Sequence, residues 1–252
     1  INSVLSQTFS DFEFLIIDDG SSDNTKNIIK SFSDKRIRYI PKINGGVVSA
    51  YKLGIMNSDS EYITFLDSDD LYNPDFLEKA YNDISKYNCD FCSYPYKAFY
   101  PDGTLKEEVF NTLPEGIYSE NNYEDLIYNH AVFNSFIREK MFIVLSLRWN
   151  KIYKSTLLKS IVSELDERCF QIEDNVFMLH VILNSKSCYI NNSFFCNNYM
   201  FQENSISLGY KGIEVFDAYM YSVNRIVDIL NSYKYKGDYS QVNALDFDSA
   251  RI

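Results

Sequence analysis

Glycine and proline are scarce in this chain, which has 9 Gly and 5 Pro among 252 residues. That composition excludes a collagen-like or linker-rich polymer, and we find no internal repeat or low-complexity segment. Aromatic residues are abundant instead, with 21 Tyr and 19 Phe, which argues against disorder over most of the length. A chain of this size can bury one sizeable core, alone or with a small appendage.

Long hydrophobic runs are also missing. The longest apolar stretch, Met141 to Leu145, is far shorter than the roughly 20 residues of a transmembrane helix, and no secretory signal pattern is present. We therefore expect a cytoplasmic protein. The first residue is Ile1 rather than Met, and Ile1 to Ser6 read as the end of an amphipathic helix, so we expect further residues before Ile1.

Positive charge is in short supply as well. The 24 Lys and Arg residues face 35 Asp and Glu residues, which gives a net charge of -11. Such a surface repels nucleic acid phosphates, so we expect no nucleic acid partner. A phosphate-bearing substrate would need a cation between its phosphates and the protein's carboxylates.

Cysteine is too sparse, and odd in number, for a disulfide framework. The five residues indicate a reducing compartment; they are Cys89, Cys92, Cys169, Cys188 and Cys196. Cys89 and Cys92 form a C-x-x-C in a strand-like run. This pair is either part of a zinc or redox site, which would need further ligands, or simply two small buried residues.

Signature motifs of several enzyme classes are absent too. The chain has no G-x-S-x-G, no P-loop and no G-x-G-x-x-G, which argues against a hydrolase, a kinase-like enzyme and a dehydrogenase. The only two histidines, His130 and His180, lie in helix-like stretches. We interpret both as packing or surface residues rather than as ligands.

What the first part of the chain does contain is an alternation of strands and helices. Apolar strands are expected at 14–17, 37–40 and 62–66, with helices at 24–32, 48–56 and 74–87. This pattern predicts an α/β fold with a mostly parallel sheet flanked by helices. Ligands of such sheets bind beyond the carboxyl ends of the strands.

The densest acidic group, Asp67-Ser68-Asp69-Asp70, directly follows the third of these strands. Neighbouring carboxylates repel one another, and a bound cation or a hydrogen-bonding ligand relieves the repulsion. Mg²⁺ or Mn²⁺ could bridge such carboxylates to a substrate diphosphate. The alternative is a solvated acidic turn before the helix that Pro74 opens. An EF-hand loop is excluded, because its glycine and late glutamate are missing.

Two further acidic pairs occupy positions where a site is expected. Asp18 and Asp19 follow the first strand, where a carboxylate can accept hydrogen bonds from a base or a ribose; the alternative is a turn-forming cluster before Gly20. Glu173 and Asp174 precede an apolar helix face. They are either helix-start residues that interact with the dipole or include a general base that activates an attacking hydroxyl.

Five blocks of the chain, in order, resemble glycosyltransferase family 2. A single block is weakly specific, whereas five in the right order over residues 1–207 form a specific pattern. The blocks are Ser3 to Asp23, Asn44 to Ile55, Tyr62 to Asp70, Trp149 to Tyr153 with Glu173-Asp174, and Ser205 to Ser207.

The resemblance implies a GT-A fold and an inverting, metal-dependent transfer of a hexose-type sugar from a nucleotide diphosphate sugar, here a UDP-sugar, to an acceptor hydroxyl. Residue by residue, Asp19 would contact the nucleobase, Asp69 the ribose or the metal, and Asp70 the metal and diphosphate. Asp174 would be the general base, and Mn²⁺ or Mg²⁺ the cofactor. The nucleotide-sugar-binding candidates together are Asp18, Asp19, Lys52, Asp67, Asp69 and Glu173.

The chain departs from the family's pattern in three places. The family's first strand, which ends in Pro-x-Tyr-Asn, is missing, so we expect a fold without it. Tyr51-Lys52 stands where the family often has Arg-Asn. Met200 and Gln202 stand where arginines often follow the closing Tyr. We therefore consider Lys52 or Lys151 as the cation that anchors the diphosphate.

The expected organisation is a catalytic domain over 1–210 and a helical extension over 211–252. Residues 1–100 form the nucleotide-binding half and 101–210 the acceptor half, with acceptor specificity in the weakly patterned segment 107–149. The acceptor is expected to be a glycan or a glycolipid in surface polysaccharide or glycolipid synthesis. A glycolipid would place the protein at the inner membrane face as a peripheral protein.

Two other classes of function remain open. One is a GT-A-like nucleotide-binding or scaffold module that has lost catalysis, although the intact Asp69, Asp70 and Asp174 favour an enzyme. The other is a sugar nucleotidylyltransferase, which requires a glycine-rich, arginine-containing N-terminal loop. No such loop occurs between Ile1 and Ile252.

Overall fold

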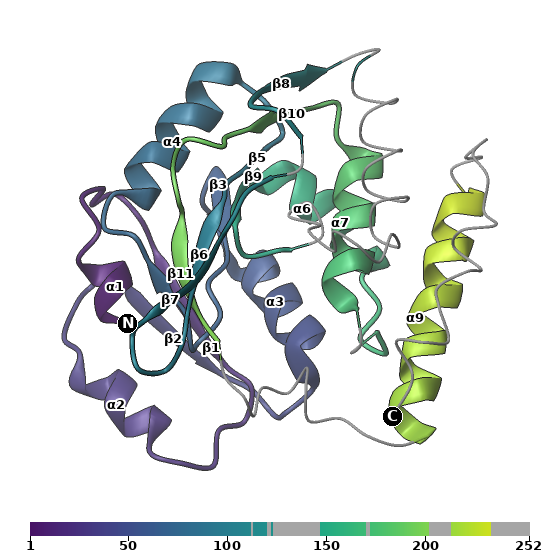
Figure 1. Cartoon of the computed structure of the whole chain (residues 1–252). Coiled ribbons are helices and arrows are strands. Elements are labelled where there is room, and N and C mark those ends of the chain that lie inside the picture. The colour runs from purple at the N-terminus through teal and green to yellow at the C-terminus, as the bar shows by residue number, and fades with distance from the viewer. Residues whose placement is uncertain (112, 120–121, 123–146, 170–171, 202–212, 233–252) are drawn as a thin grey trace.

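The computed structural model describes residues 1–111, 113–119, 122, 147–169, 172–201 and 213–232 (Figure 1). The helices are α1 (Asn2–Leu5), α2 (Thr25–Ser31), α3 (Gly46–Asn57), α4 (Phe76–Tyr87), α6 (Ser155–Ile161), η3 (a 3-10 turn, Val162–Glu164), α7 (Glu173–Asn184) and α9 (Ile213–Ser232). The strands are β1 (Phe14–Asp18), β2 (Ile37–Pro41), β3 (Tyr62–Thr64), β4 (Leu71–Tyr72), β5 (Phe91–Ser93), β6 (Tyr96–Phe99), β7 (Leu105–Val109), β8 (Gly116–Ser119), β9 (Lys151–Lys154), β10 (Ser187–Ile190) and β11 (Asn197–Met200).

The expected alternation of strands and helices is confirmed for the first part of the chain. β1, β2 and β3 alternate with α2, α3 and α4 in the predicted order. The helix α4 buries Phe76, Leu77, Ala80 and Ile84 on one face, and Asn88 ends it in the left-handed conformation. The segment 107–149 is described only in part, and the block Ser205 to Ser207 lies outside the described residues.

The α/β class is confirmed, but the strand pairing is more mixed than expected. Among the described strands, three pairs are parallel (β1–β2, β5–β10 and β6–β11) and five are antiparallel. The orders are β1-β2, β3-β9-β5-β10-β8 and β4-β11-β6-β7. The main reason is β9, which enters between β3 and β5 antiparallel to both. Because β9 comes from residues 151–154, the local pattern of the first hundred residues did not reveal it.

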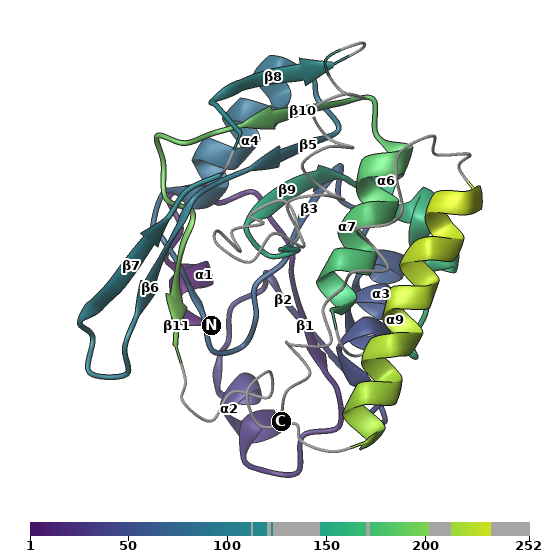
Figure 2. The same ribbon diagram turned by 45° about the vertical axis from the view of Figure 1, so that its right-hand side comes forward.

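Helices cover both faces of the five-stranded sheet (Figures 1 and 2). One core contains side chains of α3, α6 and α7 together with Phe91, Tyr153 and Ile190. The other contains α1 and α4 side chains together with Cys92 and Ile152. Neighbouring residues of one strand, such as Ile152 and Tyr153, therefore face opposite cores, as the two-residue period of a strand requires.

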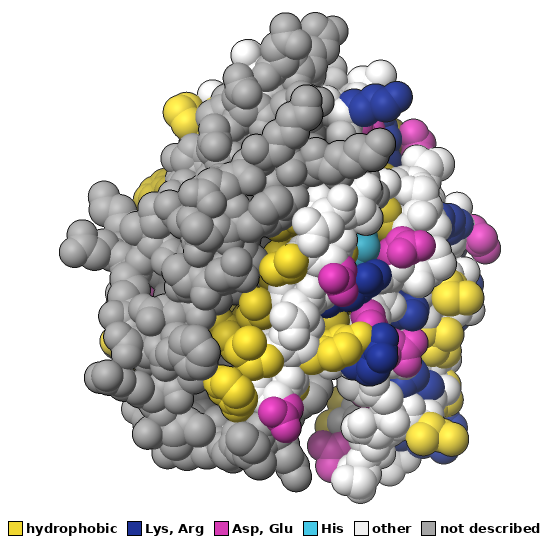
Figure 3. Space-filling model, turned by 90° about the vertical axis from the view of Figure 1, so that its right-hand side faces the viewer, with side chains coloured by type: hydrophobic (Ala, Val, Ile, Leu, Met, Phe, Trp, Pro, Cys, Tyr) yellow, Lys and Arg dark blue, Asp and Glu magenta, His cyan; other side chains and the backbone are white. Residues whose placement is uncertain are grey.

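α9 lies alongside α7 in both views (Figures 1 and 2). A third apolar cluster joins them, with Val176 and Leu179 of α7 against Ile226, Ile229 and Leu230 of α9. From the α9 side, acidic and basic side chains lie interspersed over the described surface (Figure 3). None of the described helices combines the length and apolar character needed to cross a membrane.

Candidate functional site

The loop after β3 carries the first group of carboxylates. The end of the strand is fixed by Tyr72, whose hydroxyl donates to the Phe65 carbonyl at 2.6 Å and lies 2.9 Å from Thr64 Oγ1. The Asp70 amide donates to the Asp67 carbonyl at 3.1 Å and closes a turn. The acidic run therefore sits at the carboxyl end of β3, as predicted.

Asp70 is the buried member of this run. The residue is 4% exposed, and its Oδ1 accepts a hydrogen bond from the Met200 amide at 3.0 Å. Its Oδ2 is buried and has no hydrogen-bond partner among the described residues. Burial, together with the charges of Asp67 and Asp69, raises the pKa of Asp70 to about 7. An anionic Asp70 is thus short of one positively charged or donating partner.

The second group of carboxylates opens α7. Glu173 and Asp174 form its first turn, where the helix dipole favours negative charge. The preceding Ile172 has φ of +51°, in the left-handed region that β-branched residues rarely adopt. Its carbonyl nevertheless accepts from the Asn175 amide at 3.0 Å and the Val176 amide at 3.2 Å. The chain therefore holds a strained residue just before the two carboxylates.

Arg148 joins the two acidic groups. Its Nη2 donates to Asp67 Oδ1 at 3.1 Å and its Nε to Asp174 Oδ1 at 3.2 Å, while its backbone amide lies 3.4 Å from Asp174 Oδ2. The guanidinium is 5% exposed and lies over the rings of Tyr51 and Phe65, 5.0 and 5.2 Å from their centroids. We name Asp67, Asp69, Asp70, Glu173 and Asp174 the acidic cluster.

The two helix-start carboxylates are poorly solvated. Burial, with a further contribution from the Asp174 charge, raises the pKa of Glu173 to about 7. Burial also raises the pKa of Asp174, although the Arg148 charge opposes the shift. A carboxylate whose pKa approaches neutrality is a stronger base than a solvated one, which suits proton abstraction.

The Trp149-Asn150-Lys151 block, which follows Arg148, is buried in the protein. Asn150 is fully buried, and its Nδ2 donates to the Tyr94 carbonyl at 2.7 Å. Lys151 is also fully buried; its Nζ donates to Asn150 Oδ1 at 2.7 Å and to the Leu147 carbonyl. Burial lowers the pKa of Lys151 to about 7. These contacts place the Lys151 amine inside the protein rather than at a diphosphate.

Asp18 lies at the carboxyl end of β1, as predicted, but its carboxylate is occupied. Asp18 is buried, and its side chain accepts from the Tyr39 hydroxyl at 2.5 Å and from the Ser21 amide at 2.8 Å. These hydrogen bonds lower the pKa of Asp18. The contacts fit the alternative of a turn-forming aspartate.

Asp19 faces the loop that begins α3. Its carboxylate accepts from the amides of Gly45 at 2.9 Å and Gly46 at 2.8 Å and pairs with Lys42. Burial raises its pKa, but the bonds from Lys42, Gly45 and Gly46 outweigh burial and lower it overall. Gly20 packs against this loop, where a Cβ atom would lie 2.8 Å from the Asn44 amide nitrogen. The described contacts of Asp18 and Asp19 are thus separate from the acidic cluster.

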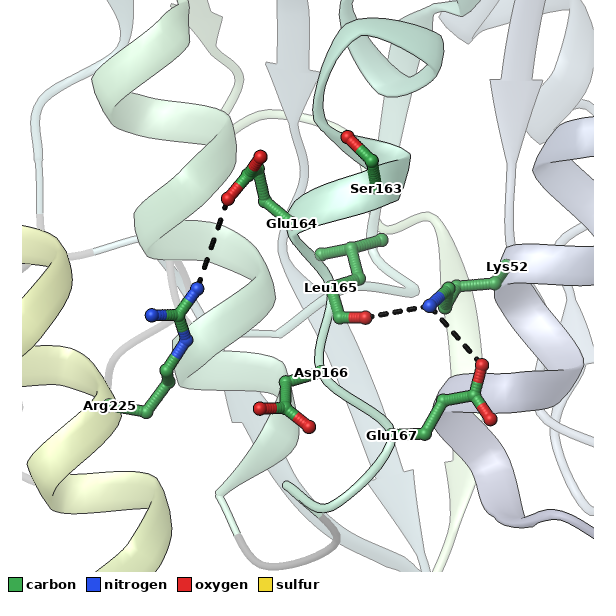
Figure 4. Close-up of a pocket in the computed structure, with 7 residues that line it drawn as sticks. All are labelled: Lys52, Ser163, Glu164, Leu165, Asp166, Glu167 and Arg225. Atoms are coloured by element: carbon green, nitrogen blue, oxygen red, sulfur yellow. Dashed lines mark hydrogen bonds and ion pairs between the residues drawn. The ribbon is translucent and has the colours of Figure 1, made fainter.

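Lys52 lines a pocket of about 280 Å³, and the residues of the acidic cluster are not among the residues that line it (Figure 4). Its amine donates to the Leu165 carbonyl at 2.8 Å and pairs with Glu167 at 3.2 Å. Arg225 of α9 approaches Glu164 at 3.9 Å on the other side. The predicted diphosphate contact of Lys52 therefore finds no supporting contact among the described residues.

Arg148 is the functional-site residue that sequence reasoning missed. The only signal was a single arginine inside the apolar and aromatic run Leu145 to Tyr153.

The sulfur atoms of Cys89 and Cys92 lie 3.4 Å apart, and both residues are buried. No group of three or more His, Cys, Asp or Glu residues that could hold a metal occurs in the described part of the chain.

A divalent cation nevertheless fits the strand-end carboxylates. Mg²⁺ sites of enzymes use one or two protein carboxylates and complete the coordination with substrate phosphates and water, so a cluster of three ligands is not required. The buried Oδ2 of Asp70 has no partner in the described part of the chain, and the neighbouring Asp69 is exposed. These two residues could each contribute an oxygen ligand.

The sequence profile of the family described as Glycosyl transferase family 2 matches residues 1–145. The chain belongs to glycosyl transferase family 2. Among its relatives, Glycosyltransferase GlyA of Streptococcus pneumoniae serotype 4 is 29% identical over 82% of this chain and 29% of that protein. The poly(ribitol-phosphate) beta-N-acetylglucosaminyltransferase TarP of Staphylococcus aureus N315 is 31% identical over 74% of this chain and 53% of that one.

Solved structures confirm the GT-A fold of this family member. The S. aureus TarS 1-349 structure in complex with UDP-GlcNAc matches with a TM-score of 0.68 and 20% identity, over 97% of this chain and 64% of that chain. The chain spans less than two thirds of the length of GlyA and of TarP.

Proposed function

We propose that this glycosyltransferase moves a hexose-type sugar from a UDP-sugar to a hydroxyl group of a surface glycan or glycolipid, with inversion at the anomeric carbon. Asp174 is the general base, and Asp69 and Asp70 hold Mn²⁺ or Mg²⁺. Family membership supports the sugar transfer, and TarP, which is named for transfer to poly(ribitol-phosphate), supports a polymeric acceptor.

One observation carries the assignment of the site. The carboxylates at the end of β3 and those at the start of α7 are far apart in the sequence, yet Arg148 binds Asp67 and Asp174 at 3.1 and 3.2 Å. A displacement reaction needs leaving-group stabilisation and a base in one place. The acidic cluster contains the base, and a cation held by its strand-end carboxylates would stabilise the leaving group.

The reaction proceeds by a single displacement. Asp174 accepts the proton of the acceptor hydroxyl while the hydroxyl oxygen forms a bond to the anomeric carbon. The bond from that carbon to the diphosphate oxygen breaks. The raised pKa of Asp174 makes it a stronger base than a solvated aspartate. Glu173 adds negative charge beside the base.

The strand-end carboxylates act on the donor side. Asp69 and Asp70 would hold a divalent cation, which would supply charge stabilisation for the departing diphosphate. The Met200 amide orients the Asp70 carboxylate, whose Oδ2 has no partner among the described residues. Asp19 is proposed to contact the nucleobase from the rim of β1, and Asp18 supports the turn beneath it through Tyr39 and Ser21.

A catalytically silent nucleotide-binding or scaffold module is the second candidate. The engaged carboxylate of Asp19 favours the scaffold form of this candidate, because Gly45, Gly46 and Lys42 occupy the oxygen atoms that a nucleobase would use. An enzyme would have to exchange some of these contacts on binding its donor.

Calorimetric titration with UDP, GDP and CMP, each with and without Mn²⁺, tests the proposal. We expect one nucleotide to bind tightly only with Mn²⁺, and the Asp70→Ala variant to lose that binding. Cation-dependent binding without release of UDP from UDP-sugars would favour the scaffold. A folded protein that binds none of the nucleotides would rule out the transferase and leave a scaffold that binds no nucleotide.

A further inference from the structure

A single buried cation connects the donor side and the base of this site. Arg148 is 5% exposed, and its guanidinium donates through different nitrogens to Asp67 and Asp174. Asp67 belongs to the loop after β3, and Asp174 belongs to the first turn of α7. Each element therefore has a carboxylate fixed to the same rigid, planar group.

Arg148 is itself held on three sides. The rings of Tyr51 and Phe65 lie 5.0 and 5.2 Å from its guanidinium carbon, and these two rings contact each other edge to face at 6.2 Å between centroids. Its backbone carbonyl accepts a hydrogen bond from the buried Tyr153 hydroxyl at 2.7 Å. The fork can therefore neither rotate freely nor leave its place.

The Asp174 carboxylate is oriented by this arrangement. Arg148 Nε donates to Oδ1, and the Arg148 backbone amide lies 3.4 Å from Oδ2. Both oxygens thus receive a donor from the same residue, which fixes the plane of the carboxylate. The side chain remains 20% exposed, so one edge of it stays open to an incoming hydroxyl.

We propose that Arg148 is a positioning residue that fixes the orientation of the Asp174 base relative to the donor-binding loop through Asp67. The proposal rests on the function proposed above. The role depends on the planar shape of the arginine side chain and not only on its charge. A lysine at this position would keep the positive charge but lacks the planar fork that binds two carboxylates at once.

The first experiment measures turnover of UDP-GlcNAc with Mn²⁺, with water standing for the acceptor hydroxyl, in Arg148→Lys and wild-type protein. We expect kcat to fall ~10- to 100-fold, because a base displaced by about 1 Å loses much of its effect, with the donor KM changed less than about threefold. Arg36→Lys is the matched control, since Arg36 also pairs with a carboxylate, Asp34, and lies over a ring, Phe12. It should leave kcat unchanged.

A second background separates positioning from a general structural effect. If Arg148 acts through Asp174, then Arg148→Lys should reduce the residual turnover of the Asp174→Asn variant by less than about twofold, because the base it orients is already gone. An equal loss in both backgrounds, or a wild-type kcat in Arg148→Lys, would overturn the proposal.

A measurement without turnover tests the connection directly. The urea midpoints of Asp67→Asn, Asp174→Asn and the double variant should be non-additive, because both carboxylates share one guanidinium. The pair Asp34→Asn and Asp174→Asn, which shares no partner, should be additive. Additive shifts for Asp67 and Asp174 would overturn the proposal. A wild-type protein that releases UDP from no UDP-sugar defeats the proposed function, and the urea series then decides for Arg148 alone.

Discussion

At the scale of single residues, Asp70 shows a conflict between stability and function. The residue is 4% exposed and leaves Oδ2 without a partner among the described residues. A buried charge without a partner costs more than a neutral polar group in the same place. Asp70→Asn keeps an acceptor for the Met200 amide and removes the charge, so we expect the melting temperature without metal to rise by several degrees.

The same substitution should abolish Mn²⁺-dependent binding of UDP, measured by calorimetry beside the thermal scan. Asp69→Asn is the matched control: Asp69 is exposed, so its loss should weaken metal binding while the melting temperature stays within about 1 °C. A lower melting temperature for Asp70→Asn would mean that its carboxylate stabilises the metal-free protein.

Glu173 should set the acid side of the pH profile together with Asp174. Burial and the Asp174 charge raise the pKa of Glu173 to about 7, and burial raises that of Asp174. The base must be deprotonated, so kcat should fall toward acid at a higher pH than a solvated aspartate would give. Glu173→Gln removes the neighbouring negative charge and should move this limb to lower pH. An unmoved limb in a pH series of kcat would show that Glu173 does not influence the base.

At the scale of secondary-structure elements, Asp19 fixes the start of α3. Its carboxylate accepts from the Gly45 and Gly46 amides, as a capping side chain does. We expect Asp19→Ala to lower the stability by about 1–2 kcal/mol, measured by urea unfolding at pH 7. Asp59→Ala, at an exposed position outside the helices, is the control. Because the folded-state pKa of Asp19 is lowered, its contribution should be present above about pH 4 and disappear below it. A pH-independent effect would contradict the capping role.

Element positions near the site could be predicted from the sequence because they depend on local patterns. The apolar runs before Asp18 and Asp67 became β1 and β3, and the helix that begins at Glu173 is α7. The antiparallel insertion of β9 and the bridge by Arg148 depend on contacts between distant segments. Local periodicity contains no information on such contacts, and a buried arginine looks like any charged residue in a sequence.

At this scale a predicted role can also differ from the observed contacts. The sequence places Lys52 one residue after Tyr51 on α3. One helix step turns the side chain by about 100°, so Tyr51 lies under Arg148 while Lys52 pairs with Glu167. A motif alignment assigns a role to a position, whereas the direction of the side chain depends on the helix phase against its neighbours.

At the scale of the whole molecule, α7 connects the site to α9. Asp174 lies at the start of α7, and His180 lies on the same helix, 3% exposed. Neither ring nitrogen of His180 has a hydrogen-bond partner among the described residues. Burial, with a smaller contribution from the charge of Arg225 on α9, lowers the pKa of His180 to about 4. This confirms the sequence interpretation of His180 as a packing residue; His130 lies outside the described residues.

The buried imidazole should make the molecule sensitive to mild acid. Between its ordinary pKa near 6.5 and about 4, the unfolded chain binds a proton that the folded protein does not, so stability falls as the pH drops through this window. From pH 7 to pH 5 the loss is about 2 kcal/mol.

The carboxylates with raised pKa act in the opposite direction, so the net pH dependence of the wild type has no simple sign. The difference between wild type and His180→Leu isolates the histidine, because the carboxylates are common to both. We expect this difference in urea-unfolding free energy to shift in favour of His180→Leu by about 2 kcal/mol between pH 7 and pH 5. A constant difference would mean that His180 charges without cost, which would require α9 to separate from α7 before the ring is protonated.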